Sequence, residues 1–193
     1  MGLLMSPRAL RTRARILDVA LDLFERQGYD TTTTAQIAAA AGVTPMTFFR
    51  HFSTKAAVLV SDPYDPVIAE HVGAQPVGLP PLDRTRRGML AALVMIEPVE
   101  DATARRRVAL LAGEPALRVA VAAGTATTEK VIVERLVADG ADPFDARVAA
   151  AACLAAATAA ILLLPETGGS LAGAVTRALE QLGAEAPSRA VRS

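Results

Sequence analysis

The sequence of 193 residues predicts an all-α protein, and three observations carry that prediction. Hydrophobic residues make up 52% of the chain, enough for a sizeable core, and many of them are alanine, which favours helices. Aromatic residues make up only 4%, and no stretch alternates β-branched residues with turn signals as strands do. Proline and glycine also punctuate the chain at intervals that suit the starts and ends of helices.

A short helix is predicted to begin after Thr33. Threonine is a good N-cap, and Gln36 three residues later completes a capping box. Ile37 and Ala38 face one side of this helix, and Gly42 supplies the residue that ends it. A longer helix, from about Pro7 to Gln27, precedes it and should stop at Gly28.

A second short helix follows at once. Thr44 is its predicted cap, and Pro45 takes the first position, where a missing N–H costs nothing. Phe48 and Phe52 lie four residues apart and can pack on the preceding helix. The side chains left pointing outward are Thr44, Met46, Thr47 and Arg50. Two helices joined by a short turn, the second with a polar outer face, form the helix-turn-helix pattern, whose second helix enters the major groove of DNA.

The order and spacing of several residues in this region form a recognisable pattern. These residues are Gly28, Thr33, Ile37, Ala38, Ala41, Gly42, Val43, Thr44, Phe49, His51, Phe52 and Lys55. This order resembles the DNA-binding domain of TetR-type transcriptional repressors over about the first third of the chain. The rest is similar only in length and helical character. Two positions depart from the pattern: Met46 stands where a small residue is common, and Phe49 stands where tyrosine is common and so lacks the phosphate-binding hydroxyl.

The resemblance implies a division into a DNA-binding head, residues 1–53, and a body for effector binding and dimerisation, residues 54–193. Bases would be read by Thr44, Pro45, Met46, Thr47 and Arg50, and the DNA backbone would be held by Thr33, Phe49, His51 and Lys55. A twofold dimer implies a pseudo-palindromic operator on double-stranded DNA. Repression and activation are not distinguished by these residues.

Charge is unevenly distributed although the formal net charge is zero. Residues 1–55 carry seven basic and four acidic groups, and the remainder carries thirteen basic and sixteen acidic groups. A basic head is what phosphate attraction would require, although ordinary surface variation can produce the same difference. Arg8, Arg11 and Arg15 line one face near the start of the first helix, where they either meet phosphates or form a solvated face.

The body is predicted to be a series of helices. Ser53 should cap a helix that residues 61–65 interrupt, because Pro63 and Pro66 disturb the chain there, and a short helix should then run to about residue 74. Further helices are predicted at about 82–97, 99–112, 115–139, 143–164 and 170–183.

The last two of these helices are the candidate homodimer interface. Residues 148–164 carry small side chains all round, and the following helix has one apolar stripe of Leu171, Val175, Leu179 and Leu182. A monomer that buries both helices internally is the alternative.

An effector site is predicted in the body, beside its arginine clusters. Arginine beside apolar residues suits a small apolar or acyl-type effector with an anionic head group. The candidate residues are Met89, Leu93, Arg105, Arg106, Leu110 and Leu117. The alternative is that these arginines form solvated faces balanced by nearby carboxylates.

The sequence offers no catalytic constellation, no metal-ligand spacing and no cofactor-binding motif. Cys153 is the only cysteine, which excludes an intrachain disulfide and favours the cytoplasm. The apolar run 148–164 is too short and too rich in alanine to predict a membrane span. Two other functions stay open: a small-molecule carrier or enzyme with a vestigial head, and an architectural DNA-binding protein without an effector.

Overall fold

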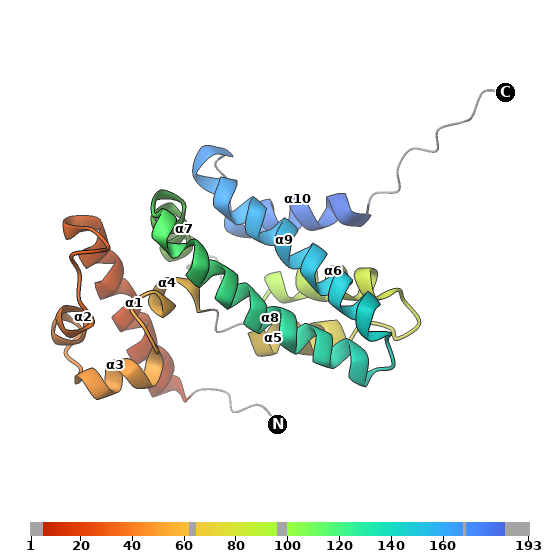
Figure 1. Ribbon diagram of the computed structural model, residues 1–193, viewed down its shortest axis with the longest axis horizontal. Helices are drawn as coiled ribbons and strands as arrows, with labels where there is room; N and C mark the ends of the chain where they lie inside the picture. The colour runs from red at the N-terminus through yellow and green to blue at the C-terminus, as the bar shows by residue number, and fades with distance from the viewer. Residues whose placement is uncertain (1–5, 62–64, 96–99, 168, 184–193) are drawn as a thin grey trace.

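The computed structural model describes residues 6–61, 65–95, 100–167 and 169–183, and within these ranges it contains helices but no strand, which confirms the predicted fold class. Figure 1 shows a head at one end and a larger helical body beside it. The helices are α1 (Pro7–Gln27), α2 (Thr34–Ala40), α3 (Pro45–His51), α4 (Ala57–Val60), α5 (Asp65–Gly73), α6 (Pro81–Leu93), α7 (Glu100–Gly113), α8 (Arg118–Ala138), α9 (Pro143–Thr167) and α10 (Leu171–Gly183), with a 3₁₀ turn, η1, at Pro115–Leu117.

Helices α2 and α3 begin at the predicted caps. The Thr33 hydroxyl accepts a hydrogen bond from the Gln36 amide at 3.2 Å, and the Thr33 amide donates to the Gln36 side chain at 2.8 Å, so the capping box is complete. The Thr44 hydroxyl accepts from the Thr47 amide at 3.1 Å. Gly42 adopts a φ of 62° in the turn between them, a conformation that glycine takes without steric cost.

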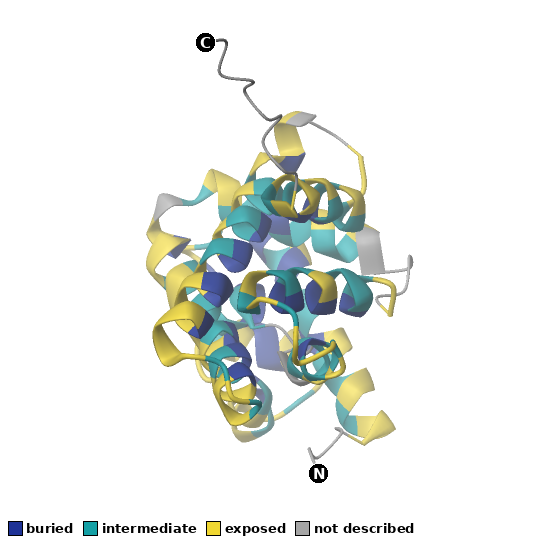
Figure 2. Ribbon diagram, turned by 90° about the vertical axis from the view of Figure 1, so that its right-hand side faces the viewer, coloured by how far each residue is buried: buried dark blue, intermediate teal, exposed yellow. Residues whose placement is uncertain are grey.

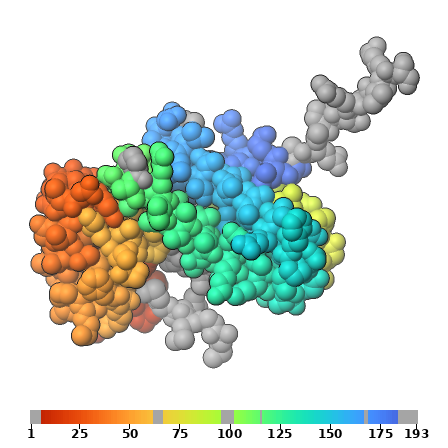
Figure 3. All heavy atoms as spheres, in the orientation of Figure 1, coloured from red at the N-terminus to blue at the C-terminus, as the bar shows by residue number. Residues whose placement is uncertain are grey.

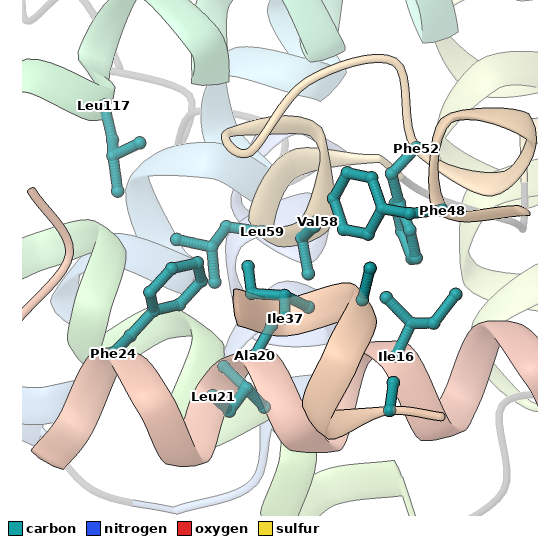
Figure 4. Packing of buried hydrophobic residues seen from close by; sticks show 12 residues of the cluster. Ile16, Ala20, Leu21, Phe24, Ile37, Phe48, Phe52, Val58, Leu59 and Leu117 are labelled. Atoms are coloured by element: carbon teal, nitrogen blue, oxygen red, sulfur yellow. The ribbon is translucent and has the colours of Figure 1, made fainter. Parts of the chain in front are cut away.

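The core of the head lies where α2 and α3 pack on α1. Phe48 and Ile37 are fully buried there, against a stripe on α1 made of Ile16, Ala20, Leu21 and Phe24. Figure 4 shows that Val58 and Leu59 of α4 enter the same cluster, and that Leu117 reaches it from the body. Residues beyond position 53 therefore complete the hydrophobic core of the head. The division into two domains after residue 53 stays a prediction.

Helix α4 differs from the sequence prediction. The hydroxyl of Thr54, instead of Ser53, accepts a hydrogen bond from the Ala57 amide at 3.0 Å, and the helix is only four residues long. The predicted break over residues 61–65 falls largely on 62–64, which lie outside the described residues, and α5 then starts at Asp65 as predicted. Helix α6 ends at Leu93, earlier than predicted, whereas α9 continues to Thr167 with Pro165 inside its last turn.

The body is built around α9, which packs against α6, α7, α8 and α10. Figure 2 shows the buried sides of the body helices turned toward one another. Small residues of α9 such as Ala146, Ala150 and Cys153 are fully buried in this core. Burial raises the pKa of the Cys153 thiol to about 11, so this side chain stays protonated and packs as a small apolar group.

Two body helices, α5 and α6, approach each other very closely at Gly88. A Cβ atom placed on Gly88 would lie 2.5 Å from the Cα atom of Val72, which is a backbone atom that cannot rotate away. We expect Gly88→Ala to lower the free energy of unfolding by about 1–3 kcal/mol because the two helices must separate. Urea denaturation followed by circular dichroism measures this difference.

Gly113→Ala is the matched control for this substitution. Gly113 is the last residue of α7, and a Cβ atom there would meet nothing within 4 Å. Its replacement should be neutral or stabilising by about 0.5–1 kcal/mol. Equal losses in the two variants would contradict a specific close contact at Gly88.

Candidate nucleic-acid interface and internal cavity

The outer face of α3 gathers the side chains that the sequence predicts to read bases. Met46 is 83% exposed, and Thr44, Pro45 and Arg50 are exposed beside it, while Thr47 is half-buried. On the opposite face Phe48 is fully buried, so the helix is fixed to the head from behind. A rigid seven-residue helix with a polar and apolar outer surface is the form of a recognition helix.

Phe49 lies at the edge of this face and is 52% exposed. Its ring packs edge-on against Phe48, with the ring centroids 5.4 Å apart and an interplanar angle of 88°. The ring therefore braces α3 and still reaches the surface where tyrosine is common in the family that the sequence resembles.

The carboxyl end of α3 is held by an arginine from α1. Arg13 donates from Nη1 to the carbonyl oxygen of His51 at 2.7 Å, and its guanidinium lies 4.1 Å from the centroid of the Phe52 ring. Sequence reasoning did not assign this role. The signal was present, because Arg13 precedes Ile16 by three residues and so belongs to the buried stripe of α1, unlike Arg8 and Arg11.

The imidazole of His51 is half-buried at the end of α3. Burial lowers its pKa below the ordinary value of 6.5, and the nearby charges of Arg50 and Arg13 lower it further. His51 is therefore neutral at neutral pH, and its ring N–H remains a hydrogen-bond donor that suits a phosphate oxygen.

The ammonium of Lys55, a residue predicted to hold the DNA backbone, makes contacts within the head. Its ammonium donates to the carbonyl oxygens of Tyr29 at 2.7 Å and Asp30 at 3.4 Å, and it lies 4.1 Å from the centroid of the Tyr29 ring. These contacts tie the segment after α3 to the turn between α1 and α2. These contacts indicate that Lys55 has a structural role, which is to hold two segments of the head together.

The basic and acidic residues of α1 lie at its two ends. Arg8, Arg11 and Arg15 are exposed near its start, on the end of α1 that approaches α3. Nearer its other end, Asp22 and Glu25 accept hydrogen bonds from Arg106 of α7, at 2.6 and 2.7 Å. The hydrogen bond from Arg106 holds the pKa of Glu25 below its ordinary value. The carboxylates of α1 are thereby engaged by the body, away from the exposed arginines.

An apolar cavity of about 230 Å³ lies inside the body, between residues of α4 and of every helix from α5 to α10. Met89 and Leu93, two of the predicted effector residues, line it. The other four do not: Leu110 and Leu117 pack with the core of the head, Arg106 binds α1, and Arg105 donates to the carbonyl of Gly169. Neither arginine of the predicted pair therefore lines this cavity, and both guanidinium groups have partners elsewhere.

Arg107 is the arginine that does line the cavity. It lies on the same face of α7 as Ala104, Val108 and Leu111, which also line the cavity. This helical spacing was visible in the sequence and was the signal that distinguishes Arg107 from Arg105 and Arg106.

The outer surface of α9 is apolar along most of its length. Phe144, Val148 and Leu163 are 75%, 52% and 49% exposed, and the exposed residues Ala151, Ala155 and Ala159 continue the stripe between them. By contrast, Val175 and Leu179 of α10 are buried in the subunit's own core. Residues Pro143–Glu166 have the length and apolarity of a membrane span, and 33% of their most apolar window is buried.

No three His, Cys, Asp or Glu side chains within the described ranges are grouped so that they could hold a metal ion.

The exposed α3 on a compact helix-turn-helix head defines a DNA-binding regulator. One family model, described as bacterial regulatory proteins of the tetR family, matches residues 16–61. A second, described as the MftR C-terminal domain, matches residues 79–187, which is more than half of the chain. The chain belongs to the TetR family of transcriptional regulators.

Individual relatives agree with this assignment. The HTH-type transcriptional regulator TcmR of Streptomyces glaucescens is 39% identical over 85 residues, which are 43% of this chain and 38% of TcmR. AcrR of Shigella flexneri is 51% identical over 47 residues, 24% of this chain and 22% of AcrR. The matched parts therefore span well under half the length of these relatives.

Solved structures share the fold. A complex of SmeT with triclosan has a TM-score of 0.55 and 23% identity, with 89% of this chain and 90% of that one covered. NalD, the secondary repressor of the MexAB-OprM multidrug efflux pump in Pseudomonas aeruginosa, has a TM-score of 0.53 and 21% identity, with 91% and 95% covered.

The contacts of Lys55 allow a test of its structural role. Lys55→Met should lower the free energy of unfolding by about 1–2 kcal/mol, because a charge-assisted hydrogen bond and a cation–π contact are lost. Lys130→Met provides the control, since the chain's only other lysine is mostly exposed on α8. Urea denaturation should separate the two variants, and an unchanged midpoint for Lys55→Met would contradict the assigned role.

The lowered pKa of His51 predicts a pH dependence of stability. Between the folded pKa and the ordinary value of 6.5, the unfolded chain binds protons that folded His51 does not, so stability falls as the pH is lowered through this interval. We expect wild type to lose more stability than His51→Gln between about pH 8 and about pH 5. Denaturation series at several pH values measure the difference. A constant offset between the two proteins across the range would contradict the shift.

Proposed function

We propose that this chain is a transcriptional repressor that binds a pseudo-palindromic operator as a homodimer and leaves it when a small apolar effector occupies the cavity. The observation that carries the proposal is the exposed face of α3, which buried Phe48 holds in a fixed orientation. The effector part rests on the apolar cavity, whose lining includes residues of α4 and α7, two helices that contact α1 of the head.

In this proposal α3 enters the major groove and its outer residues read base edges. Met46 and Pro45 offer apolar contact to a thymine methyl group, and Arg50 can pair with guanine. Thr33, Phe49 and His51 approach the DNA backbone, together with the exposed arginines of α1. Lys55 stabilises the head, since its ammonium is bound to the carbonyls of the α1–α2 turn.

The dimer is proposed to form through the outer face of α9, with α10 beside it. An exposed apolar stripe along a whole helix is unusual for a monomer, and pairing two copies would bury it. The small residues between Val148 and Leu163 allow the two helices to approach closely. A cytoplasmic setting suits the free, buried Cys153. The alternative to a repressor is a small-molecule carrier or enzyme with a vestigial head. The following experiment distinguishes these two functions.

A selection from a random pool of DNA duplexes tests DNA recognition directly. The purified protein at moderate salt should recover a palindromic motif whose half-sites are one helical turn or more apart. Thr47→Ala should change the recovered bases, because Thr47 lies on the outer face of α3. Recovery of no motif by a folded, dimeric protein would shift the function to the carrier or enzyme.

Arg11→Ala is the comparison variant for backbone contact. Arg11 is exposed on α1 and does not belong to the predicted base-reading face of α3, so its loss should weaken binding to specific and scrambled duplexes alike. The slope of log affinity against log salt should fall in magnitude by about one unit. If Thr47→Ala and Arg11→Ala each lowered the affinity for specific and scrambled duplexes by the same factor, the division into base and backbone contacts would be wrong.

A further inference from the structure

Arg107 brings a guanidinium group to a cavity whose other described lining residues are apolar or carry hydroxyl groups. Among the lining residues that belong to the described ranges, Arg107 is the one cation and none is acidic. The hydroxyls of Thr125 and Thr128 donate to carbonyls of their own helix, those of Val121 at 3.0 Å and Gly124 at 3.4 Å. The guanidinium is therefore the ionic feature that a ligand in this cavity would meet.

Arg107 also binds the end of α4, the last helix joined to the head. Its Nε and Nη2 atoms donate to the carbonyl oxygen of Leu59 at 3.1 and 2.7 Å, and Nη2 lies 3.4 Å from the carbonyl oxygen of Ser61. These carbonyls belong to the carboxyl end of α4, where backbone acceptors lack helical partners and carry partial negative charge. One guanidinium thus belongs both to the cavity wall and to the junction with the head.

A second arginine continues this connection to the recognition helix. Arg13 of α1 donates to the carbonyl oxygen of Ser61 at 3.4 Å and to that of His51 at 2.7 Å. The two arginines therefore share the Ser61 carbonyl, one from the head and one from the body. A continuous set of hydrogen bonds runs from the cavity wall, through the end of α4, to the end of α3.

Helix α7 contacts both the cavity and the head. Figure 3 shows α7 lying directly against the head. Arg106 binds Asp22 and Glu25 of α1, while the next residue, Arg107, binds α4. Helix α4 itself is four residues long, and its Val60 carbonyl oxygen lies close to α8, 3.1 Å from where a Cβ atom on Gly124 would stand. A helix of one turn cannot act as a long lever. Helix α7 lines the cavity and binds both α1 and α4, so it connects the cavity with the head.

We propose that the effector is a small apolar molecule with one carboxylate, and that this carboxylate binds Arg107 and takes it from the Leu59 and Ser61 carbonyls. This inference rests on the proposed function. An ionised carboxylate accepts two parallel hydrogen bonds from a guanidinium and is a stronger acceptor than a neutral carbonyl. A carboxylate in the cavity would therefore compete with the Leu59 and Ser61 carbonyls for Arg107. When the bond from Arg107 to α4 is lost, the end of α4 can move. Helix α3 can then move as well, because Arg13 joins the end of α4 to the end of α3.

The cavity volume limits the size of this ligand. About 230 Å³ is roughly the space of eight water molecules in the liquid, which suits a short aliphatic chain with a single head group. Octanoate and octan-1-ol are therefore the probes, because they share the apolar chain and differ in the charge of the head group.

The experiment measures binding of both probes by calorimetry and release of the selected operator by fluorescence anisotropy. Wild type should bind octanoate about tenfold or more tightly than octan-1-ol, because only the carboxylate makes a charge-assisted pair. Arg107→Met keeps the apolar wall and should bind the two probes equally. It should also bind the operator more weakly than wild type and show no response to octanoate.

Two further variants keep the test decisive. Arg105→Met removes the neighbouring arginine, which does not line the cavity, and should keep the preference for octanoate. Arg107→Lys keeps the charge without the two-pronged geometry and should keep only part of that preference. The inference is overturned if wild type binds both probes equally, if neither binds, or if Arg107→Met still prefers octanoate. If octan-1-ol releases the operator and octanoate does not, the effector is not a carboxylate, and the proposed function still stands. If no operator can be selected, the proposed function itself is overturned.

Discussion

The burial of Phe48 and Ile37 against α1 is the constraint on which the head depends. Helices α2 and α3 have seven residues each, and helices of that length are not stable alone in water. Their caps and the turn at Gly42 choose where they start and stop, but the apolar stripe of α1 supplies the packing that keeps them folded. The exposed face of α3 has a defined orientation only because its opposite face is fully buried.

The same core links the head to the body. Leu59 of α4 and Leu117 at the start of α8 complete the cluster around Phe24, so the head is not closed without residues from the body (Figure 4). Arg106 and Arg107 add polar contacts from α7 to α1 and α4. A change in the position of α7 therefore reaches the head through both apolar packing and hydrogen bonds.

The three consecutive arginines of α7 show how strongly position on a helix decides role. Residues 105, 106 and 107 point in directions about 100° apart, because an α-helix has 3.6 residues per turn. Arg105 consequently meets the Gly169 carbonyl, Arg106 meets the carboxylates of α1, and Arg107 faces the cavity and α4. Composition alone describes all three as one basic cluster, and it does not show that Arg107 lines the cavity while Arg105 and Arg106 do not.

The sequence by itself determined the fold class, the helix starts at Thr33 and Thr44, and the outer face of α3, because capping, turn formation and helical periodicity are local properties of neighbouring residues. The family resemblance followed from the same residues and is confirmed. Only the tertiary structure decided that Lys55 binds carbonyls of the α1–α2 turn, that Arg13 holds the end of α3, and that Arg107 lines the cavity. Each of these contacts joins residues 25 or more positions apart, and their partners depend on how the helices cross, which no local pattern specifies.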